Sequence, residues 1–216
     1  MKVAIVIIPD ATTQAEARAL SESAEGASYS LSRNSNTPHI SLCHISTSLF
    51  NKEHAIADMR MVCSFLEIPE IVCGVMSHTS HVRDKWQYWN MEKNPGVEEL
   101  HSSIYRELCK TIPPEVLVKS YPYIEEAFVP HITLAATKMK GDTLVTSKRW
   151  VGMTLSIVSL GEYGEITETF FSRNLYADQV TNLISNVLPE ITKLHDIRSI
   201  EPAGKYRKHD KRTPYG

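Results

Sequence analysis

Apolar residues recur along the chain with two different periods. Short runs rich in β-branched and aromatic residues predict strands, and apolar residues spaced three and four positions apart predict helices. The strands expected are 2–8, 39–45, 71–76, 85–91, 131–137, 153–160 and 166–172. The helices expected are 12–24, 51–66, 95–111 and 177–188. The first half therefore has the outline β-α-β-α-β, and strands and helices alternate in a mixed fold.

Composition places the chain among ordinary globular proteins. It has 216 residues, of which 42% are hydrophobic and 22% charged. These fractions exclude disorder, collagen and coiled coil for the whole chain, and the length allows one domain or two small lobes. The formal charge of −2 gives no global attraction to nucleic acid or anionic membrane, so any nucleotide contact must be local. Basic residues gather only near the end, over 205–216, where we expect a solvated tail.

No segment is expected to cross or enter a membrane. The apolar run Val3 to Ile8 is stopped by Pro9 and Asp10, and no run approaches the ~18 residues that a span requires. The four cysteines are too sparse and too widely spaced for a disulfide framework, so we interpret them as reduced and mostly buried thiols. We therefore expect a cytoplasmic protein.

The strongest signal is a short repeat. Pro38-His39-Ile40-Ser41-Leu42 and Pro130-His131-Ile132-Thr133-Leu134 differ only in the hydroxyl residue. With 11 prolines and 9 histidines, chance predicts about 0.5 Pro-His pairs in the whole chain, yet both of these continue with the same pattern.

Strand geometry gives this repeat a chemical meaning. His39 and Ser41 project from one face of their strand, as do His131 and Thr133, while the aliphatic residues anchor the other face. Two imidazoles with pKa values near 6.5 can act as a base and an acid together, and hydroxyls are hydrogen-bond donors. This set suits phosphodiester cleavage and needs no metal. The alternative is two unrelated strands whose histidines only form hydrogen bonds.

These residues resemble the two-histidine (2H) phosphoesterase superfamily, which includes LigT-like 2′,5′ RNA ligases and cyclic nucleotide phosphodiesterases. The resemblance rests on the paired His-x-[Ser/Thr] motifs, on Phe128-Val129-Pro130 and on Glu98-Glu99-Leu100-His101. It implies an α+β, bilobal LigT-like fold with pseudo-twofold symmetry, in which two antiparallel sheets line a central groove with helices outside. It also implies that His39 and His131 are the acid–base pair and that Ser41 and Thr133 bind the phosphate. The resemblance covers residues 1–176, and we expect 177–216 to be a C-terminal helix and basic tail.

Other candidate residues carry weaker signals. His44 follows His39 by an odd number of strand positions, so we expect it on the opposite face as a structural histidine. For the same reason, His39, Cys43 and His44 do not form a convincing zinc site, and no cofactor or metal is expected. His101 has no partner signature. Trp86 and Tyr88 share a strand face that Trp89 does not. The possible base-stacking residues are Trp86, Tyr88, Tyr123 and Phe128.

The leading hypothesis is a metal-independent phosphodiesterase, expected to be a monomer. Its substrate would be a nucleotide, cyclic nucleotide or short RNA with a 2′,5′ or 2′,3′-cyclic phosphodiester. Two alternatives stay open: a module of the same fold that binds a nucleotide or RNA end without cleaving it, and a zinc-dependent hydrolase.

Overall fold

The structure is a computed structural model, which describes residues 1–22, 27–32, 36–68, 73–76, 82–83, 86–92, 94–123, 127–136 and 148–177. The chain divides into two units, Met1–Gln179 and Val180–Gly216, and all of the described residues belong to the first unit. Except for Ala177, the helix expected over 177–188 lies outside the described residues, as does the basic tail.

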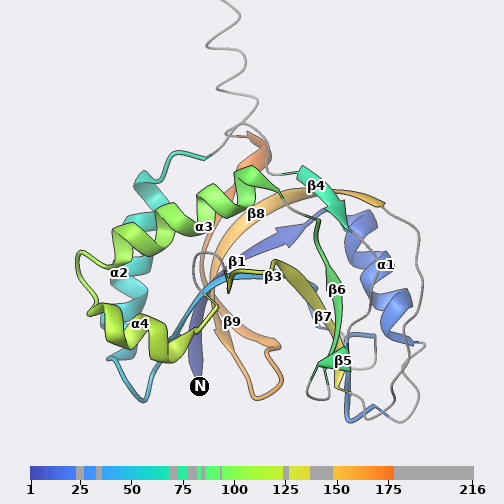
Figure 1. The fold of residues 1–216 in the computed structure, drawn as a ribbon, viewed down its shortest axis with the longest axis horizontal. Coiled ribbons are helices and arrows are strands. Elements are labelled where there is room, and N and C mark those ends of the chain that lie inside the picture. Colours follow the sequence, from blue (N-terminus) through green and yellow to red (C-terminus); the bar gives the residue numbers. More distant parts are fainter. Residues whose placement is uncertain are drawn as a thin grey trace, which may run out of the picture. The chain divides into compact units, whose positions relative to one another are not determined.

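Within the described residues, strands and helices follow the predicted order closely (Figure 1). The strands are β1 (Lys2–Pro9), β2 (Tyr29–Ser30), β3 (Ile40–Ser46), β4 (Cys73–Met76), β5 (Val82–Arg83), β6 (Trp86–Asn90), β7 (His131–Ala136), β8 (Lys148–Leu160) and β9 (Ile166–Asn174). The helices are α1 (Ala11–Glu22), α2 (Lys52–Phe65), α3 (Pro95–Leu108) and α4 (Pro114–Ser120). The sequence pattern did not predict β2, β5 or α4.

Side-chain caps fix where three of the helices begin. The side chain of Asp10 accepts a hydrogen bond from the backbone N–H of Thr13, and Asn51 and Asn94 do the same at α2 and α3. A capping oxygen satisfies a backbone donor that the first turn leaves unpaired. The capping residues therefore define where α1, α2 and α3 begin.

The strands form one curled antiparallel sheet in the order β4-β8-β1-β3-β7-β6-β5, with β9 added beside β8 and β2 beside β7 (Figure 1). Its centre is the contact between β3 and β7, where the register contains a single pair, Ile40 opposite Ile132. The two sheets expected from the sequence are thus two halves of one sheet that meet at this pair.

The two halves repeat each other in detail. Strand β1 pairs with β3 as β6 pairs with β7, and Val6 opposite Ser41 corresponds to Tyr88 opposite Thr133. Both ladders shift register at the next leucine, Leu42 in β3 and Leu134 in β7, which marks a β-bulge at the same point of each motif strand. The expected pseudo-twofold symmetry is therefore present in the hydrogen-bond register.

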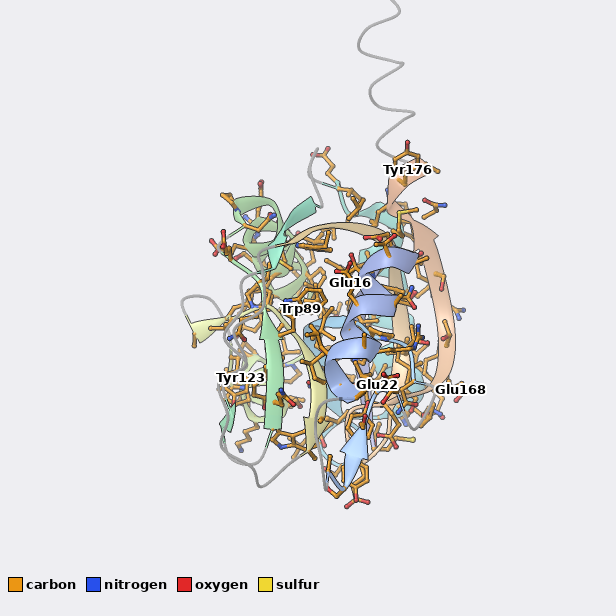
Figure 2. The ribbon with its side chains drawn as sticks, turned by 90° about the vertical axis from the view of Figure 1, so that its right-hand side faces the viewer. Glu16, Glu22, Trp89, Tyr123, Glu168 and Tyr176 are labelled. Carbon is orange, nitrogen blue, oxygen red and sulfur yellow. The ribbon has the colours of Figure 1, made fainter. Side chains whose placement is uncertain are left out.

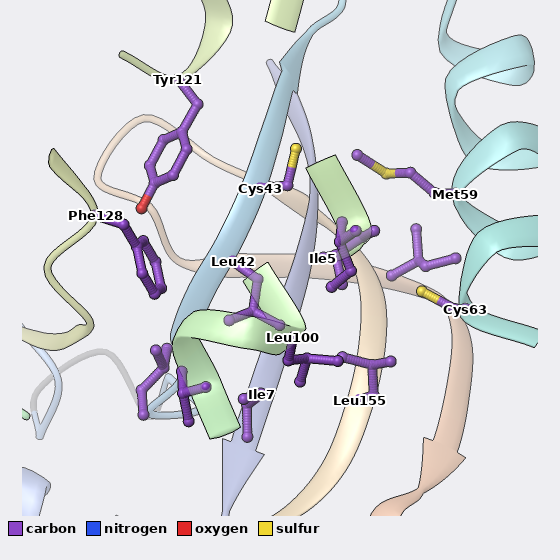
Figure 3. Packing of buried hydrophobic residues seen from close by; sticks show 14 of the residues in the cluster. Ile5, Ile7, Leu42, Cys43, Met59, Cys63, Leu100, Tyr121, Phe128 and Leu155 are labelled. Carbon is purple, nitrogen blue, oxygen red and sulfur yellow. The ribbon is translucent and has the colours of Figure 1, made fainter. Parts of the chain in front are cut away.

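The core lies mainly on the face of the sheet covered by α2 and α3. Ile5, Leu42, Leu100 and Leu155 meet there with side chains from both helices (Figure 3). Burial of this apolar surface is the main force that holds the helices on the sheet.

Buried and exposed aromatic residues separate clearly at the edge of this core. Trp89 is 2% exposed and packed among other side chains, whereas Tyr123 is 44% exposed (Figure 2).

As expected, Cys43 and Cys63 are buried free thiols. In the described part of the chain, no helix is both long and apolar enough to span a bilayer.

Candidate active site

The two motifs lie side by side at the centre of the sheet. Because Ile40 is opposite Ile132 in an antiparallel pair, the same register brings His39 opposite Thr133 and Ser41 opposite His131. All four side chains belong to the face opposite the two isoleucines, which we call the motif face. This register therefore places two histidines and two hydroxyl residues symmetrically about the pair Ile40 and Ile132.

Both imidazoles are oriented by the same local contact. The Nδ1 of His39 is 2.9 Å from the carbonyl oxygen of Thr37, and the Nδ1 of His131 is 2.8 Å from the carbonyl oxygen of Val129. A carbonyl oxygen only accepts, so Nδ1 carries the hydrogen in both rings. The neutral form of each ring then has its lone pair on Nε2, which is the atom left for proton transfer.

Burial lowers the pKa of both histidines. For His39, desolvation is the largest cause, the Thr37 carbonyl acts in the opposite direction, and the charge of His131 lowers the pKa further. For His131, desolvation again outweighs the raising effect of the Val129 carbonyl. In the free protein both rings are therefore neutral at pH 7, and a bound anion would favour protonation of one of them.

The hydroxyls of Ser41 and Thr133 are available to a ligand. Both residues are partly exposed, and within the described residues neither hydroxyl takes part in a hydrogen bond. The backbone of Ser41 is held separately, because the hydroxyl of Tyr121 lies 3.5 Å from its carbonyl oxygen.

Two of the four possible base-stacking residues lie on the motif face. Tyr88 is opposite Thr133, and its ring centroid is 4.3 Å from that of His131. Trp86 is opposite Ala136 and has edge contacts with the rings of Tyr29 and Tyr163. Trp89 points to the core, as the alternation predicted.

The other two base-stacking candidates lie elsewhere. Phe128 is 6% exposed, and its ring stacks on that of His101 at 3.9 Å with an interplanar angle of 3°. We correct the role of Phe128 to packing. Its ring is buried in the core and covered by His101, so it offers no platform on which a base could stack. Tyr123 is exposed and has an edge contact with Tyr121.

The prediction that His44 lies on the opposite face from His39 was wrong. The bulge at Leu42 adds one residue to β3, so that Ala4 is opposite His44 and Val6 opposite Ser41. Ala4 and Val6 share a face of β1, and His44 is therefore on the motif face with Ser41. Desolvation by burial is the largest cause of the lowered pKa of this ring, and the charges of His39 and His131 also lower it.

Sequence reasoning missed His101 and Tyr121, which support the motifs from behind. His101 is 2% exposed, and its Nδ1 is 2.7 Å from the carbonyl oxygen of Leu42, to which it donates. Tyr121 contacts the rings of both His44 and His101. A signal for Tyr121 was present: Ser28-Tyr29 and Ser120-Tyr121 stand at the same distance before the two motif histidines.

The described residues provide no metal-binding cluster at the two motifs, and a surface hollow that they line lies away from these motifs. The described residues contain no group of three or more His, Cys, Asp or Glu side chains placed to hold a metal ion. A hollow of about 590 Å³ lies between α2 and α3, lined by residues that include Met61, Phe65 and Arg106, and no motif residue borders it.

Comparison with known proteins defines the class of fold. Protein-family profiles and curated protein sequences give no match. Among solved structures, the chain is similar to TT0787 of Thermus thermophilus, with 15% identity, a TM-score of 0.63, and coverage of 81% of this chain and 98% of that one.

Two further structures support the same assignment. Escherichia coli LigT complexed with NADP+ is 12% identical, with a TM-score of 0.54 and coverage of 80% and 96% of the two chains. A protein described as a phosphoesterase is 12% identical, with a TM-score of 0.51 and coverage of 80% and 97%. The fold is LigT-like, which confirms the fold class expected from the motifs.

Proposed function

We propose that this protein is a metal-independent phosphodiesterase that cleaves RNA-type 2′,5′ or 2′,3′-cyclic phosphodiester bonds in nucleotides or short oligonucleotides. The observation that carries the proposal is the symmetric pair of imidazoles. Each has Nδ1 bonded to a carbonyl two residues earlier, and each has Nε2 left for chemistry on the same face of two adjoining strands. The phosphoesterase and LigT names of similar folds agree with it.

In the proposed reaction the two histidines transfer protons in opposite directions. The neutral ring takes a proton at Nε2 from water or a ribose hydroxyl, whose oxygen then forms a bond to phosphorus. The bond from phosphorus to the leaving oxygen breaks, and this oxygen takes the proton from Nε2 of the protonated ring. Ser41 and Thr133 donate hydrogen bonds to the non-bridging oxygens, where negative charge increases.

Tyr88 and Trp86 are proposed to contact the base of the substrate. Both lie on the motif face beside Thr133 and Ala136, and every base can stack on an aromatic ring. The NADP+ bound in the LigT structure supports a nucleotide as the kind of ligand.

The second candidate function is a module that binds a nucleotide or RNA end without turnover. Intact histidines and hydroxyls in both motifs favour catalysis over binding alone. The test is a panel of 2′,3′-cyclic nucleotides, cyclic dinucleotides and 2′,5′-linked oligonucleotides, with products identified by mass and by the hydroxyl that keeps the phosphate.

We expect turnover of at least one member of the panel, unchanged in excess chelator. Binding without turnover across the panel would favour the module. Loss of activity on chelation, restored by zinc or magnesium, would favour the metal-dependent hydrolase instead.

A further inference from the structure

The symmetry of the two halves makes their differences informative. Ala136 and His44 occupy equivalent positions, because each follows its motif histidine by the same number of residues and lies just beyond the bulge of its strand. Ala136 is opposite Trp86 in the neighbouring strand, whereas His44 is opposite Ala4. In one half the large residue is Trp86 of the neighbouring strand, opposite the small Ala136. In the other half the large residue is His44 of the motif strand itself, opposite the small Ala4.

These positions define two ends of the motif face. Ser41 is opposite His131, so His44, further along β3, lies toward the His131 end. Thr133 is opposite His39, so Ala136 and Trp86 lie toward the His39 end. Tyr29 and Tyr163 contact Trp86 there, and their rings stack on each other at 5.6 Å. The His39 end is aromatic, and the His131 end has an imidazole beside Tyr121.

His44 is neutral at every pH at which the proposed reaction could occur. Desolvation is the largest cause of its low pKa of about 3, and the charges of Lys2, His39 and His131 lower it further. The ring therefore supplies no positive charge to a phosphate, and it does not compete with His39 and His131 as an acid.

The fold alone does not account for an imidazole at this position. Nε2 of His44 is buried and has no hydrogen-bond partner among the described residues. An unpaired buried nitrogen costs free energy that an apolar side chain of similar size would avoid. The ring therefore lowers the stability of the free protein, and a bound group that pairs with this nitrogen would account for its presence.

We propose that His44 forms a subsite at the His131 end that binds an uncharged, hydroxyl-bearing part of the substrate, namely the second sugar of a phosphodiester. This rests on the proposed function. It places the base of the other nucleoside, on the opposite side of the phosphate, at the aromatic His39 end. A neutral imidazole has one donor and one acceptor, and a sugar hydroxyl can pair with either, directly or through one ordered water. Substrates with a sugar on each side of the phosphate would then be preferred to cyclic mononucleotides.

The test compares two substrates in two variants at His44. His44→Phe keeps the ring volume and removes both nitrogens, and His44→Gln keeps a donor and an acceptor. The ratio of kcat/KM for a 2′,5′-linked dinucleotide to that for a 2′,3′-cyclic mononucleotide should fall about ten-fold in His44→Phe, the size of a lost hydrogen bond to a neutral group. It should fall much less in His44→Gln. The matched control is His54→Ala, which removes an exposed imidazole on α2 and should leave the ratio unchanged.

A change in the substrate provides the second arm. A dinucleotide whose second sugar lacks its free hydroxyls should be cleaved about ten-fold less efficiently than its parent by the wild-type protein, again the size of one lost hydrogen bond. His44→Phe should no longer distinguish the two, and its Tm should equal or exceed that of the wild type.

Three outcomes would overturn the subsite: an equal loss on both substrates, no loss on either, or a lower Tm in His44→Phe, which would give the ring a structural role. If the wild-type protein cleaves neither substrate, the proposed function fails, and this result is distinct from a failure of the subsite alone.

Discussion

Each catalytic candidate is positioned by its own strand. The carbonyl that fixes the ring belongs to the residue two places earlier, with Pro38 or Pro130 between, so no distant side chain is needed to set the tautomer. Both Pro38 and Pro130 are buried, and the fixed φ of each proline restrains the chain at the point where it enters the motif strand. Removal of one imidazole should therefore leave the other ring in place.

We expect His39→Ala and His131→Ala each to reduce kcat by roughly 10²–10⁴-fold, the range for a lost general acid or base. The double variant should be little worse than either single one, because groups that act in one step are not additive. Steady-state kinetics with circular dichroism as a fold control would measure this. Turnover near the wild-type rate in either single variant would disprove the assignment.

The lowered pKa values also predict the pH dependence of the rate. The active form needs one neutral and one protonated imidazole, and burial lowers the pKa of both in the free protein. The bell-shaped profile of kcat/KM should therefore have its maximum below pH 6.5, the ordinary value for histidine. A bound phosphate favours the charged ring, so the profile of kcat should lie at higher pH.

Profiles of both parameters on a slow substrate would test this, since product release must not limit the rate. The two limbs belong to the coupled pair, and each histidine variant should retain only one of them. A kcat/KM that is flat from about pH 5 to 9, with chemistry shown to limit the rate, would contradict the mechanism.

At the scale of the element, the bulges set the limit of what the sequence predicts. Strict alternation placed His39, Ser41, His131 and Thr133 on one face correctly, because all four precede the bulges. The same rule failed for His44, which follows the bulge at Leu42. A bulge depends on how a strand pairs with its neighbour, and a single strand's apolar pattern does not reveal it.

Helix α3 links both motif strands through one side chain. Its apolar residues at helical spacing predicted the buried face, including Leu100. The sequence did not predict the role of His101 on that face, because the residues that it contacts come from distant parts of the chain. It donates to the carbonyl of Leu42 in β3 and stacks on Phe128, just before β7.

We therefore expect His101→Phe to lower the free energy of unfolding by about 1–3 kcal/mol, since the buried Leu42 carbonyl would lose its donor while the stacked ring remains. His101→Asn should keep a donor and lose the stacking. Urea unfolding of both variants would separate the two contributions. A His101→Phe protein as stable as the wild type would show that the hydrogen bond to Leu42 contributes nothing.

At the scale of the whole described unit, the candidate site lies where two similar halves meet. Among the described residues, the pairing of β3 with β7 across the centre consists of Ile40 opposite Ile132. Tyr121 and the end of α4 follow the open edge of β3, where the hydroxyl of Ser120 accepts a hydrogen bond from the N–H of Ser46. Such long-range pairing is not encoded in any local period, which is why the repeat predicted the symmetry but the pattern missed α4.

The same central position gives the whole fold a pH dependence. His39, His44 and His131 lie near one another, and burial lowers the pKa of each below its ordinary value of 6.5. Between pH 6.5 and these lower values, the unfolded chain binds more protons than the folded one. The folded state is therefore destabilised progressively as the pH falls below about 6.5, and this loss of stability is absent at higher pH.

We expect the free energy of unfolding to decrease as the pH is lowered from about 6.5 to 4.5, by up to about 1.4 kcal/mol per pH unit for each proton of difference. Urea midpoints at about pH 7.5, 6.5, 5.5 and 4.5 would measure the decrease. The pKa of His44, at about 3, lies below this whole range, so His44→Phe should reduce the slope throughout it. The lowered pKa of Asp10 acts in the same direction but only near and below about pH 4, outside most of this window. Equal stability at the two ends of this range would mean that the three rings accept protons in the folded state, and the central site would then be open to water.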